Sequence, residues 1–306
     1  MGKKLIIPGA DFSRDAIIFN GVKVNTVDGT PTTAQFYHVS DNSNPGVIIT
    51  IQSGELTKFP KNTSGIDGYL DTLFYKKPIR DAEIFYDGSY SLSNAFRDCS
   101  QMDSVKIKGI IGNASDMFNN CSRLKILNLD EADFSSCTST SQMFIQCAGL
   151  LSIDLSEKTF DALTIADSMF NSCTSVLDIS LPNGMFDNCT QLQHMFLRSS
   201  SLGIINFGVQ DFAKVTNTTD WLSSCPVNRI TGSLSNIGKL TSTFGIGGTS
   251  RYDSVSMDIF INGLYDNSGA GTAKKFYMSQ YNSDNLTTTQ RNAIAAKNWE
   301  IMVAGA

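Results

Sequence analysis

Cysteine thiols are the side chains here with the widest chemical range, since they ligate metals, form disulfides and attack electrophiles. The chain of 306 residues contains seven, namely Cys99, Cys121, Cys137, Cys147, Cys173, Cys189 and Cys225. An odd number cannot pair completely within one chain. Structural zinc sites need CxxC or histidine-paired spacings, and the sequence has neither. Their local spacing therefore assigns these thiols no chemical task.

The two histidines form no catalytic pattern. His38 lies in the alternating run AQFYHVS, and His194 directly precedes a Met-Phe pair. No nucleophile elbow, Walker loop or HExxH motif occurs. The glycine-rich segment FGIGG at 244–248 lacks the lysine that follows a phosphate-binding loop, so we expect an ordinary loop there. We expect no catalytic residue, no metal site and no cofactor.

Charge and hydropathy narrow the class of partner. The formal net charge is −5 and the isoelectric point is about 5.0, whereas nucleic-acid binders present a basic field. No apolar run reaches the ~18 residues of a membrane-spanning helix. The opening MGKKLIIPGADFS has an apolar run too short for a signal-peptide core. We therefore expect no nucleic-acid partner, no membrane span and no signal peptide in this chain.

The cysteines acquire a pattern once internal repeats are sought. The words MFNNC, MFIQC and MFNSC share a phenylalanine, which we call the anchor position and which recurs at steps of 22 and then 26 residues. The anchors are Phe96, Phe118, Phe144, Phe170, Phe196 and Leu222. Three residues later come Cys99, Cys121, Cys147, Cys173, Ser199 and Cys225; sixteen later, Phe134, Phe160, Phe186 and Phe212; twenty later, Thr138, Thr164, Thr190 and Thr216.

Spacing within the repeat predicts its structure. Positions −1, 0, +3 and +6 relative to the anchor fall on one face of a short helix with period 3.6. Positions +9 and +11, such as Leu127 and Leu129, alternate as in a strand with one inward face. With Leu124 they form L-x-x-L-x-L, the core of the leucine-rich repeat, whose length of roughly 20–29 residues includes both periods. Stacking of such units completes their core.

The repeat predicts where the cysteines lie. All seven occupy position +3 or +19, where Ser199, Leu163 and Val215 also occur. A metal cluster or a disulfide ladder needs fixed residues, but a position that accepts Ser, Leu or Val needs only a small or apolar side chain. Stacked strands are about 4.8 Å apart, so neighbouring thiols can be close without being bonded. We predict that the thiols are buried as core packing.

The pattern MFxxCxxLxxIxL, followed by F and T, resembles the BspA-type leucine-rich repeats over residues 90–237. That family is known from surface proteins of Bacteroides-like and other bacteria. The ending NLTTTQRNAIAAKNWEIMVAG resembles the tail of leucine-rich proteins carried by gut bacteria and their phages, and the opening KKLIIPGADFS is similar to their start. The period of 26 departs from the family's commoner, shorter unit. The resemblance implies a solenoid displayed for recognition.

The fold class that we predict is an α/β solenoid. A right-handed leucine-rich repeat solenoid spans 71–237, between a small β-rich N-terminal domain at 1–70 and a C-terminal α/β capping region at 238–306. The runs KLIIPG, AIIF, VKVN, QFYHV and GVIITIQ indicate early strands, and AEIFYDG the strand of a degenerate repeat. Later, SMDIFINGLYDN predicts a helix, KKFYMS a strand, and a helix capped by Thr287 or Thr288 leads into the strand WEIMV.

The candidate binding surface is the outward face of the strands, the concave sheet on which solenoids usually bind. Its residues at +10 and +12 are Lys106, Lys108, Asn128, Asp130, Asp154, Ser156, Ser180 and Asn206. They are polar, mixed in charge and variable between repeats, while the inward positions are uniform. This contrast favours a contact surface for a protein or a glycan. A solvated strand face without a ligand is the alternative.

These observations predict a non-enzymatic recognition or adhesion protein on a bacterial cell surface or outside the cell. It would bind a protein or glycan ligand through the concave strand face. A phage or prophage virion component, such as a fibre or a receptor-binding subunit, is the alternative. The missing leader and the resemblances at both termini favour that alternative, which predicts a trimer because fibres are commonly trimeric.

Overall fold

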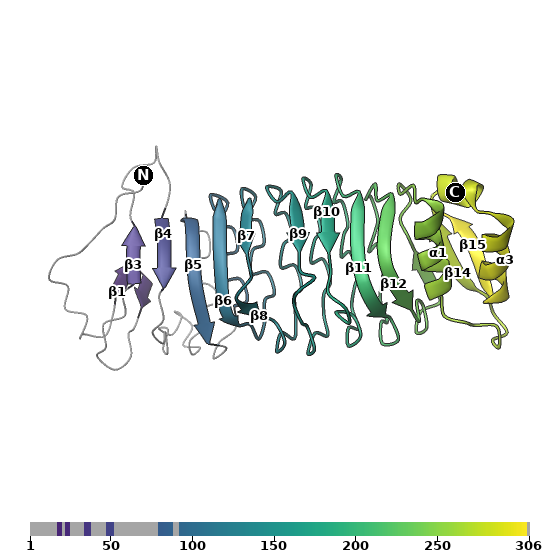
Figure 1. Cartoon of the computed structure of the whole chain (residues 1–306), viewed down its shortest axis with the longest axis horizontal. Helices are drawn as coiled ribbons and strands as arrows, with labels where there is room; N and C mark the ends of the chain where they lie inside the picture. Colours follow the sequence, from purple (N-terminus) through teal and green to yellow (C-terminus); the bar gives the residue numbers. More distant parts are fainter. Residues whose placement is uncertain are drawn as a thin grey trace.

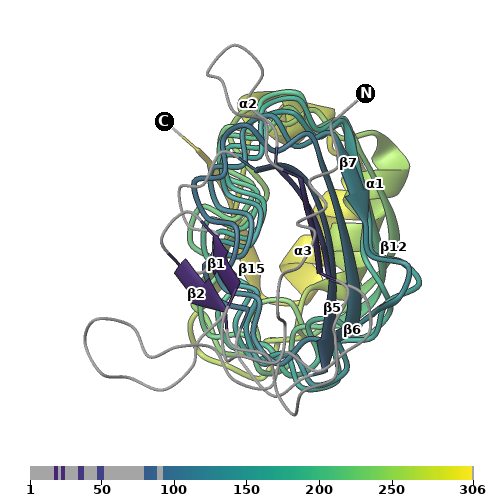
Figure 2. The ribbon, with the colours of Figure 1, turned by 90° about the vertical axis from the view of Figure 1, so that its left-hand side faces the viewer.

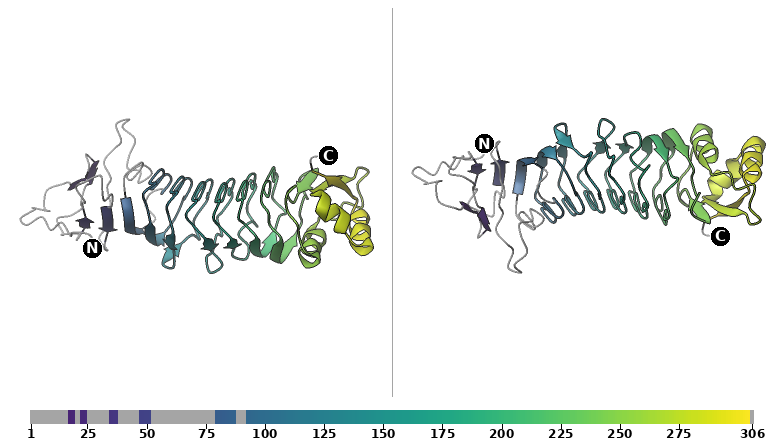
Figure 3. Two further views of the ribbon diagram at one scale, coloured as in Figure 1. Left: turned by 90° about the horizontal axis from the view of Figure 1, so that it is seen from above. Right: turned by 90° about the horizontal axis from the view of Figure 1, so that it is seen from below.

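The computed structural model describes residues 92–304 in full and, before them, the backbone of five strands between residues 17 and 87. Successive repeats lie side by side along a nearly straight axis (Figures 1 and 3). Seen along that axis, each coil is a flattened loop with its strand on one side and its turns on the opposite side (Figure 2). We call these two sides the strand face and the turn side.

The strands of the early chain and the repeats are β1 (Ile17–Phe19), β2 (Val22–Val24), β3 (Ala34–Tyr37), β4 (Val47–Ile51), β5 (Ile79–Asp87), β6 (Ser104–Ile110), β7 (Ile126–Asn128), β8 (Ala132–Asp133), β9 (Ser152–Asp154), β10 (Asp178–Ser180), β11 (Ile204–Asp211) and β12 (Arg229–Ser235). The remaining elements are β13 (Thr243–Gly245), α1 (Ser254–Gly263), β14 (Lys274–Met278), α2 (Gln280–Asn285), α3 (Thr288–Ala296) and β15 (Trp299–Val303).

The strand face consists of two sheets. One runs in the order β3-β4-β5-β6-β7, with β8 beside β6, and the other runs β9-β10-β11-β12. The repeat strands are parallel to their neighbours, as expected for identical coils stacked in one direction. β4 pairs with β5 in parallel, so β3 to β5 continue the repeat sheet, whereas β1 and β2 form a separate two-stranded sheet. The predicted strands AIIF, VKVN and GVIITIQ contain β1, β2 and β4, and QFYHV and AEIFYDG overlap β3 and β5, which begin one and three residues earlier. KLIIPG lies outside the described residues.

The inward positions build one continuous core. The five anchor phenylalanines are fully buried, and each stacks on the next with ring centroids 5.6–5.8 Å apart. Position +9 or +11 supplies the buried side chains of the strands, such as Ile153 and Leu155. Leu127 departs from this rule, because it is only partly buried. The predicted burial of the seven cysteines is confirmed, since each is fully enclosed.

The predicted short helix on the turn side is wrong. Positions −2 and +2 adopt positive φ in every described repeat, for example 56° at Asp116 and 60° at Asn120. A left-handed residue at every fourth position prevents a right-handed helix from continuing. The backbone N–H groups instead reach the next repeat, as from Phe118 to the Met143 carbonyl at 2.9 Å and from Phe144 to the Met169 carbonyl at 2.9 Å. Bonds between repeats therefore replace the i to i−4 bonds of a helix.

The cysteines at +3 do more than fill space. The Cys147 thiol donates to the Phe118 carbonyl at 3.1 Å, and the Cys173 thiol donates to the Phe144 carbonyl at 3.0 Å. At the same position of another repeat, the Ser199 hydroxyl donates to the Phe170 carbonyl at 2.7 Å. The expectation that any small or apolar side chain suffices at +3 is therefore too broad. This position selects a small side chain that is also a hydrogen-bond donor.

This donor role gives a test. We expect Cys147→Ala to lower the free energy of unfolding by about 1–3 kcal/mol, because it removes a donor from a buried carbonyl and leaves a small void. Cys147→Ser keeps a donor and is expected to cost about 1 kcal/mol or less. Urea unfolding followed by circular dichroism measures both. Equal losses in the two variants would show that packing alone selects this residue.

The recurrent threonine at +20 has a similar role at the surface. The Thr164 backbone N–H and hydroxyl both donate to the Thr138 carbonyl, each at 3.0 Å. Thr216 makes the same two bonds to Thr190, again at 3.0 Å. Each threonine thus ties its repeat to the preceding one. A serine could make the bonds, but the branched threonine also restricts its own rotamer.

The C-terminal elements follow the sequence patterns closely. β14 and β15 lie within the predicted strands, and α1 overlaps the predicted helix at 256–267 but begins at Ser254 and ends at Gly263. Thr287 caps α3 through a capping box with Gln290. β13, β14 and β15 form a parallel sheet. α2 has no counterpart among the predicted elements. The Trp221 indole N–H donates to the Gly245 carbonyl at 2.6 Å, which joins this region to the last turn of the repeats.

Candidate functional site: the strand face

The predicted lysines lie together on one strand of the strand face. Lys106 and Lys108 project from β6, and their ammonium groups lie 2.7 and 3.5 Å from the Glu131 carboxylate. A hydrogen bond from Lys106 is the main cause that lowers the pKa of the Glu131 carboxyl. Because Glu131 is exposed, this network is screened by solvent and contributes little to stability. It offers a mixed surface rather than an uncompensated basic one.

Three of the predicted polar residues have local structural roles. The side-chain oxygens of Asn128, Asp154 and Asn206 accept hydrogen bonds from the backbone N–H two residues later, at 3.2, 2.9 and 3.1 Å. These are Asx turns, which close the chain after each strand. Asp154 is exposed, while Asn128 and Asn206 are partly buried. Their recurrence at +10 is therefore explained by turn formation and does not by itself require a ligand.

The remaining predicted residues do not converge on one point. Asp130 is exposed, Ser156 and Ser180 are partly buried, and the three lie in successive repeats. The Ser180 carbonyl accepts from the Leu155 N–H at 2.8 Å, so its role there is in the sheet. The eight predicted residues share the strand face, but the structure does not gather them into a single site.

A feature that the sequence analysis missed lies at the start of the strands. Four aliphatic side chains from successive repeats point outward there, which we call the apolar row: Ile126, Leu151, Leu177 and Ile204, with exposed fractions of 64, 64, 54 and 43%. The last three members are joined through the backbone, by the Leu177 N–H bond to the Leu151 carbonyl at 2.8 Å and the Ile204 N–H bond to the Leu177 carbonyl at 3.2 Å. Scattered exposed aliphatic residues are ordinary, but an aligned row is typical of an interaction surface.

The strand face is also interrupted. β7 and β9 belong to different sheets, and their interval in Figure 1 is visibly wider than that between β9 and β10. A groove of about 620 Å³ lies at this break. Its lining includes the apolar side chains of Leu127, Leu129 and Ile153, and the predicted residues Asp130 and Asp154. Two of the eight predicted residues therefore border a hollow that the repeat pattern alone does not show.

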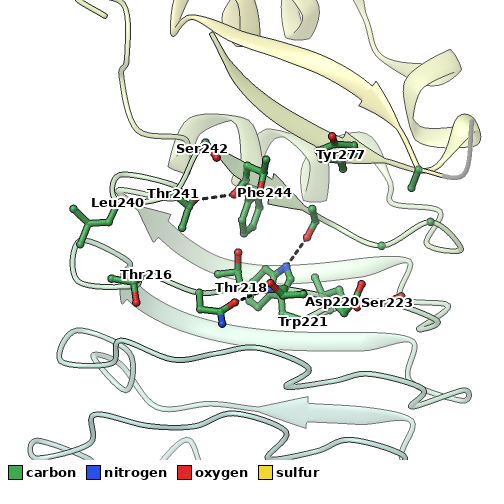
Figure 4. A pocket seen from close by; sticks show the side chains of 18 residues that line it. Thr216, Thr218, Asp220, Trp221, Ser223, Leu240, Thr241, Ser242, Phe244 and Tyr277 are labelled. Carbon is green, nitrogen blue, oxygen red and sulfur yellow. Dashed lines mark hydrogen bonds between the residues drawn. The ribbon is translucent and has the colours of Figure 1, made fainter. Parts of the chain in front are cut away.

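A second hollow, of about 580 Å³, lies between the last turn of the repeats and the C-terminal region (Figure 4). Hydroxyl groups dominate its lining, including those of Thr216, Thr218, Thr241 and Ser242. The ring of Trp221 is fully buried beneath it. The lining holds a single carboxylate, Asp220, and no histidine or cysteine. The arrangement offers neutral hydrogen bonding but no acid–base pair.

The described residues contain neither a metal-binding cluster nor a membrane-spanning helix. Within 92–304 and the five early strands, no group of three or more His, Cys, Asp or Glu side chains is placed to hold a metal ion. In the same part of the chain, no helix is long and apolar enough to cross a membrane. His194 occupies a left-handed turn position with φ 56°, partly exposed, with its Nε2 3.9 Å from the Asp220 carboxylate.

Comparison with known proteins identifies the repeat. Residues 70–185 match the BspA type leucine rich repeat region in six copies. The crystal structure of a leucine rich repeat protein of T. pallidum is similar at 17% identity, covering 90% of this chain and 99% of that one, with a TM-score of 0.37. A leucine-rich repeat protein from Bacteroides ovatus is 16% identical over 82% of this chain and 71% of its own, with a TM-score of 0.29. Among curated proteins, none matches.

Proposed function

Because this chain carries a BspA-type leucine-rich repeat region, we propose that it is a non-enzymatic recognition protein that binds a protein ligand through its strand face. The apolar row carries this proposal. Four aliphatic side chains at equivalent or adjacent positions of successive repeats remain exposed, and a row of this kind is typical of an interaction surface. The polar residues from Lys106 to Asn206 would form the rim of the contact.

The chemistry of the row favours a protein over a glycan. Burying aliphatic side chains against a partner removes apolar surface from water, which contributes about 25 cal/mol per Å². A glycan presents mostly hydroxyl groups, and aliphatic side chains leave such groups without hydrogen-bond partners. Glycan binding would instead be expected at the hydroxyl-lined hollow of Figure 4. The two ligand classes therefore predict different parts of the surface.

One pair of leucines gives a matched test. Leu177 belongs to the apolar row and is 54% exposed, whereas Leu240 is 55% exposed and lies outside it. A ligand is first identified on an array of extracellular matrix proteins and glycans. We expect Leu177→Asp to weaken binding to a protein ligand found in this way at least tenfold. Leu240→Asp is expected to change binding less than twofold. Neither substitution should alter stability by more than about 0.5 kcal/mol, because both sites are exposed.

The outcomes separate the hypotheses. Equal binding by the two leucine variants would contradict a site on the apolar row. Loss of binding only in Leu240→Asp, with a glycan as the bound array component, would place the site at the second hollow. Alanine substitutions of Asn128, Asp154 and Asn206 test the polar rim less cleanly, since they also remove the Asx turns. Circular dichroism should accompany any such variant.

The cellular setting belongs to the same proposal. We place the protein on a bacterial surface or outside the cell, as is typical of BspA-like repeat proteins. A virion fibre or receptor-binding subunit is the alternative, and it predicts a trimer. Light scattering of the purified chain would distinguish them, since three times the mass of 33.3 kDa would favour the virion alternative.

A further inference from the structure

The backbone bonds that join neighbouring repeats are missing at one step of the strand face. At position +7, the N–H of Leu177 donates to Leu151 at 2.8 Å, and that of Gly203 donates to Leu177 at 2.9 Å. Near the strand end, the Leu155 N–H donates to Ser180 at 2.8 Å, and the Leu181 N–H donates to Asn206 at 2.8 Å. The corresponding bonds, from Leu151 to Lys125 and from Leu129 to Asp154, are absent within the described residues.

Elsewhere the same two repeats are held together. On the turn side, Phe118 and Phe144 stack with ring centroids 5.6 Å apart, and the Phe118 N–H donates to Met143. Gly149 allows the closest approach, because a Cβ atom there would lie 2.7 Å from the Leu124 carbonyl oxygen. Below the strands, the Lys158 ammonium donates to the Asp130 carbonyl at 2.8 Å. The two repeats therefore remain in contact away from the strands and are separated only between β7 and β9, on the strand face.

The walls of the opening carry unused backbone groups of both kinds. The Lys125 carbonyl and the Leu129 N–H belong to lining residues on the β7 side. On the β9 side, the Asp154 carbonyl belongs to a lining residue, and the Leu151 N–H lies between the lining residues Leu150 and Ser152 in the sequence. We propose that the groove between β7 and β9 receives an extended peptide segment of a protein partner as an added parallel strand. Such a segment supplies a donor and an acceptor to each wall, as in other strand-addition complexes.

Charge indicates which residues a parallel segment would carry near each of its ends. Lys125 lies at the start of the groove, while Asp130, Asp154 and Glu157 lie at its far end. The only lysine at that end is Lys158, which binds backbone carbonyls. A segment parallel to β7 fits best with an acidic residue near its N-terminal end and a lysine or arginine near its C-terminal end. Its central side chain that points inward would meet Leu127, Leu129 and Ile153, so it should be apolar.

This inference rests on the proposed function only in placing a protein partner on the strand face. The groove does not require the aliphatic contacts of Leu177 or Ile204, and the apolar row does not require the groove. A globular partner could cover the row without inserting a strand. The two ideas can therefore fail separately, provided that the variants used for one leave the other intact.

Amide hydrogen exchange of the full chain tests the opening itself. Leu151 and Leu177 are both exposed leucines at position +7 of their repeats. Only the Leu177 amide donates a hydrogen bond to the preceding repeat. We expect the Leu151 amide to exchange about a hundredfold faster than the Leu177 amide. Equal protection of the two amides would show that the repeats pair here in solution, and would overturn the proposal.

Selection tests the occupant. A displayed library of unconstrained eight-residue peptides is selected on the full chain and then on two variants, Ser152→Trp and Asp178→Trp. Ser152 lines the groove, and Asp178 pairs with it in β10 but does not belong to the lining of the groove. We expect selected peptides to bind at least tenfold more weakly to Ser152→Trp and within twofold to Asp178→Trp. The selected peptides should have an acidic residue near the N-terminal end, a lysine or arginine near the C-terminal end, and no proline in the centre.

The backbone contribution is measured on the best selected peptide. N-methylation of a central amide is expected to weaken binding about tenfold or more, because it removes one hydrogen bond to the wall. Binding should also slow exchange at the Leu151 amide. Failure to enrich any peptide, equal binding to the two tryptophan variants, or tolerance of N-methylation at every central amide would each overturn strand addition. None of these outcomes would affect the proposed function, which is tested separately by the loss of matrix-protein binding in Leu177→Asp.

Discussion

Phe144→Ala is expected to lower the free energy of unfolding by about 3–5 kcal/mol, measured by urea denaturation. The Phe144 ring is fully buried between the rings of Phe118 and Phe170, at centroid distances of 5.6 and 5.8 Å. Removing it leaves a cavity and breaks two stacking contacts at once. In a repeat protein each unit depends on its neighbours, so the loss falls on both adjacent interfaces.

The control for this variant is Ile126→Ala, which truncates an aliphatic side chain that is 64% exposed. It is expected to change the free energy of unfolding by no more than about 0.5 kcal/mol. We also expect Phe144→Ala to broaden the urea transition, because the repeats on either side can then unfold separately. A loss below 1 kcal/mol would mean that the anchor column does not hold the stack together.

The second large effect concerns the thiols. At pH 8, a maleimide reagent should label the native protein at least a thousandfold more slowly than the urea-unfolded chain. Burial raises the pKa of Cys173, Cys189 and Cys225 from 9.0 to about 12, which reduces the reactive thiolate about a thousandfold. The same side chains are fully enclosed, so the reagent also lacks access. Mass spectrometry counts the labels.

The control is the same reaction in urea, where all seven thiols should be labelled. Rapid labelling of one or more thiols in the native protein would show that the core is open. The pKa direction also fixes the sign of the pH dependence. A thiol whose pKa is raised on folding stabilises the fold fully below pH ~9, and this contribution is lost as the pH rises towards 12. Stability should therefore fall on the alkaline side.

Sequence patterns predicted the coils well because their inward residues must fit one repeating core. The anchor phenylalanines, the cysteines and the alternating strand residues occupy one period, and a stacked core permits little variation there. The helix cap at Thr287 was also predictable, because capping depends on residues three positions apart. Structural features that depend on residues within one repeat, or on a pattern present in every repeat, can be predicted from a single sequence.

The turn side could not be predicted in the same way. Its apolar spacing is that of a helix, but positive φ at −2 and +2 falls on residues such as Gln142, Ser172 and His194 rather than on glycine. Glutamine, serine and histidine do not predict positive φ, although asparagine and aspartate adopt it more often than other non-glycine residues. The carbonyl bonds of Cys147 and Thr164 are equally invisible, since their acceptors belong to a neighbouring coil.

For the candidate site, the sequence predicted the outward face of the strands but neither the apolar row nor the groove. Alternation showed which residues point outward, but the Asx turns explain part of their polarity, and the apolar row shifts between positions +7 and +8. The groove leaves no trace in the period, because the repeats on both sides of it have the same length of 26 residues. The loss of pairing between these two units therefore cannot be predicted from spacing.

On the turn side, the backbone hydrogen bonds that join coils at positions −2, 0 and +2 run one way, from the N–H of one coil to the carbonyl of the following coil. The molecule is consequently a polar rod whose two ends are chemically different, and like ends of two copies cannot join through these groups. A duplicated unit inserted anywhere inside the rod would find matching partners above and below. Length can thus change by whole units during evolution, whereas each end needs its own closing device, as Trp221 provides through its bond to Gly245.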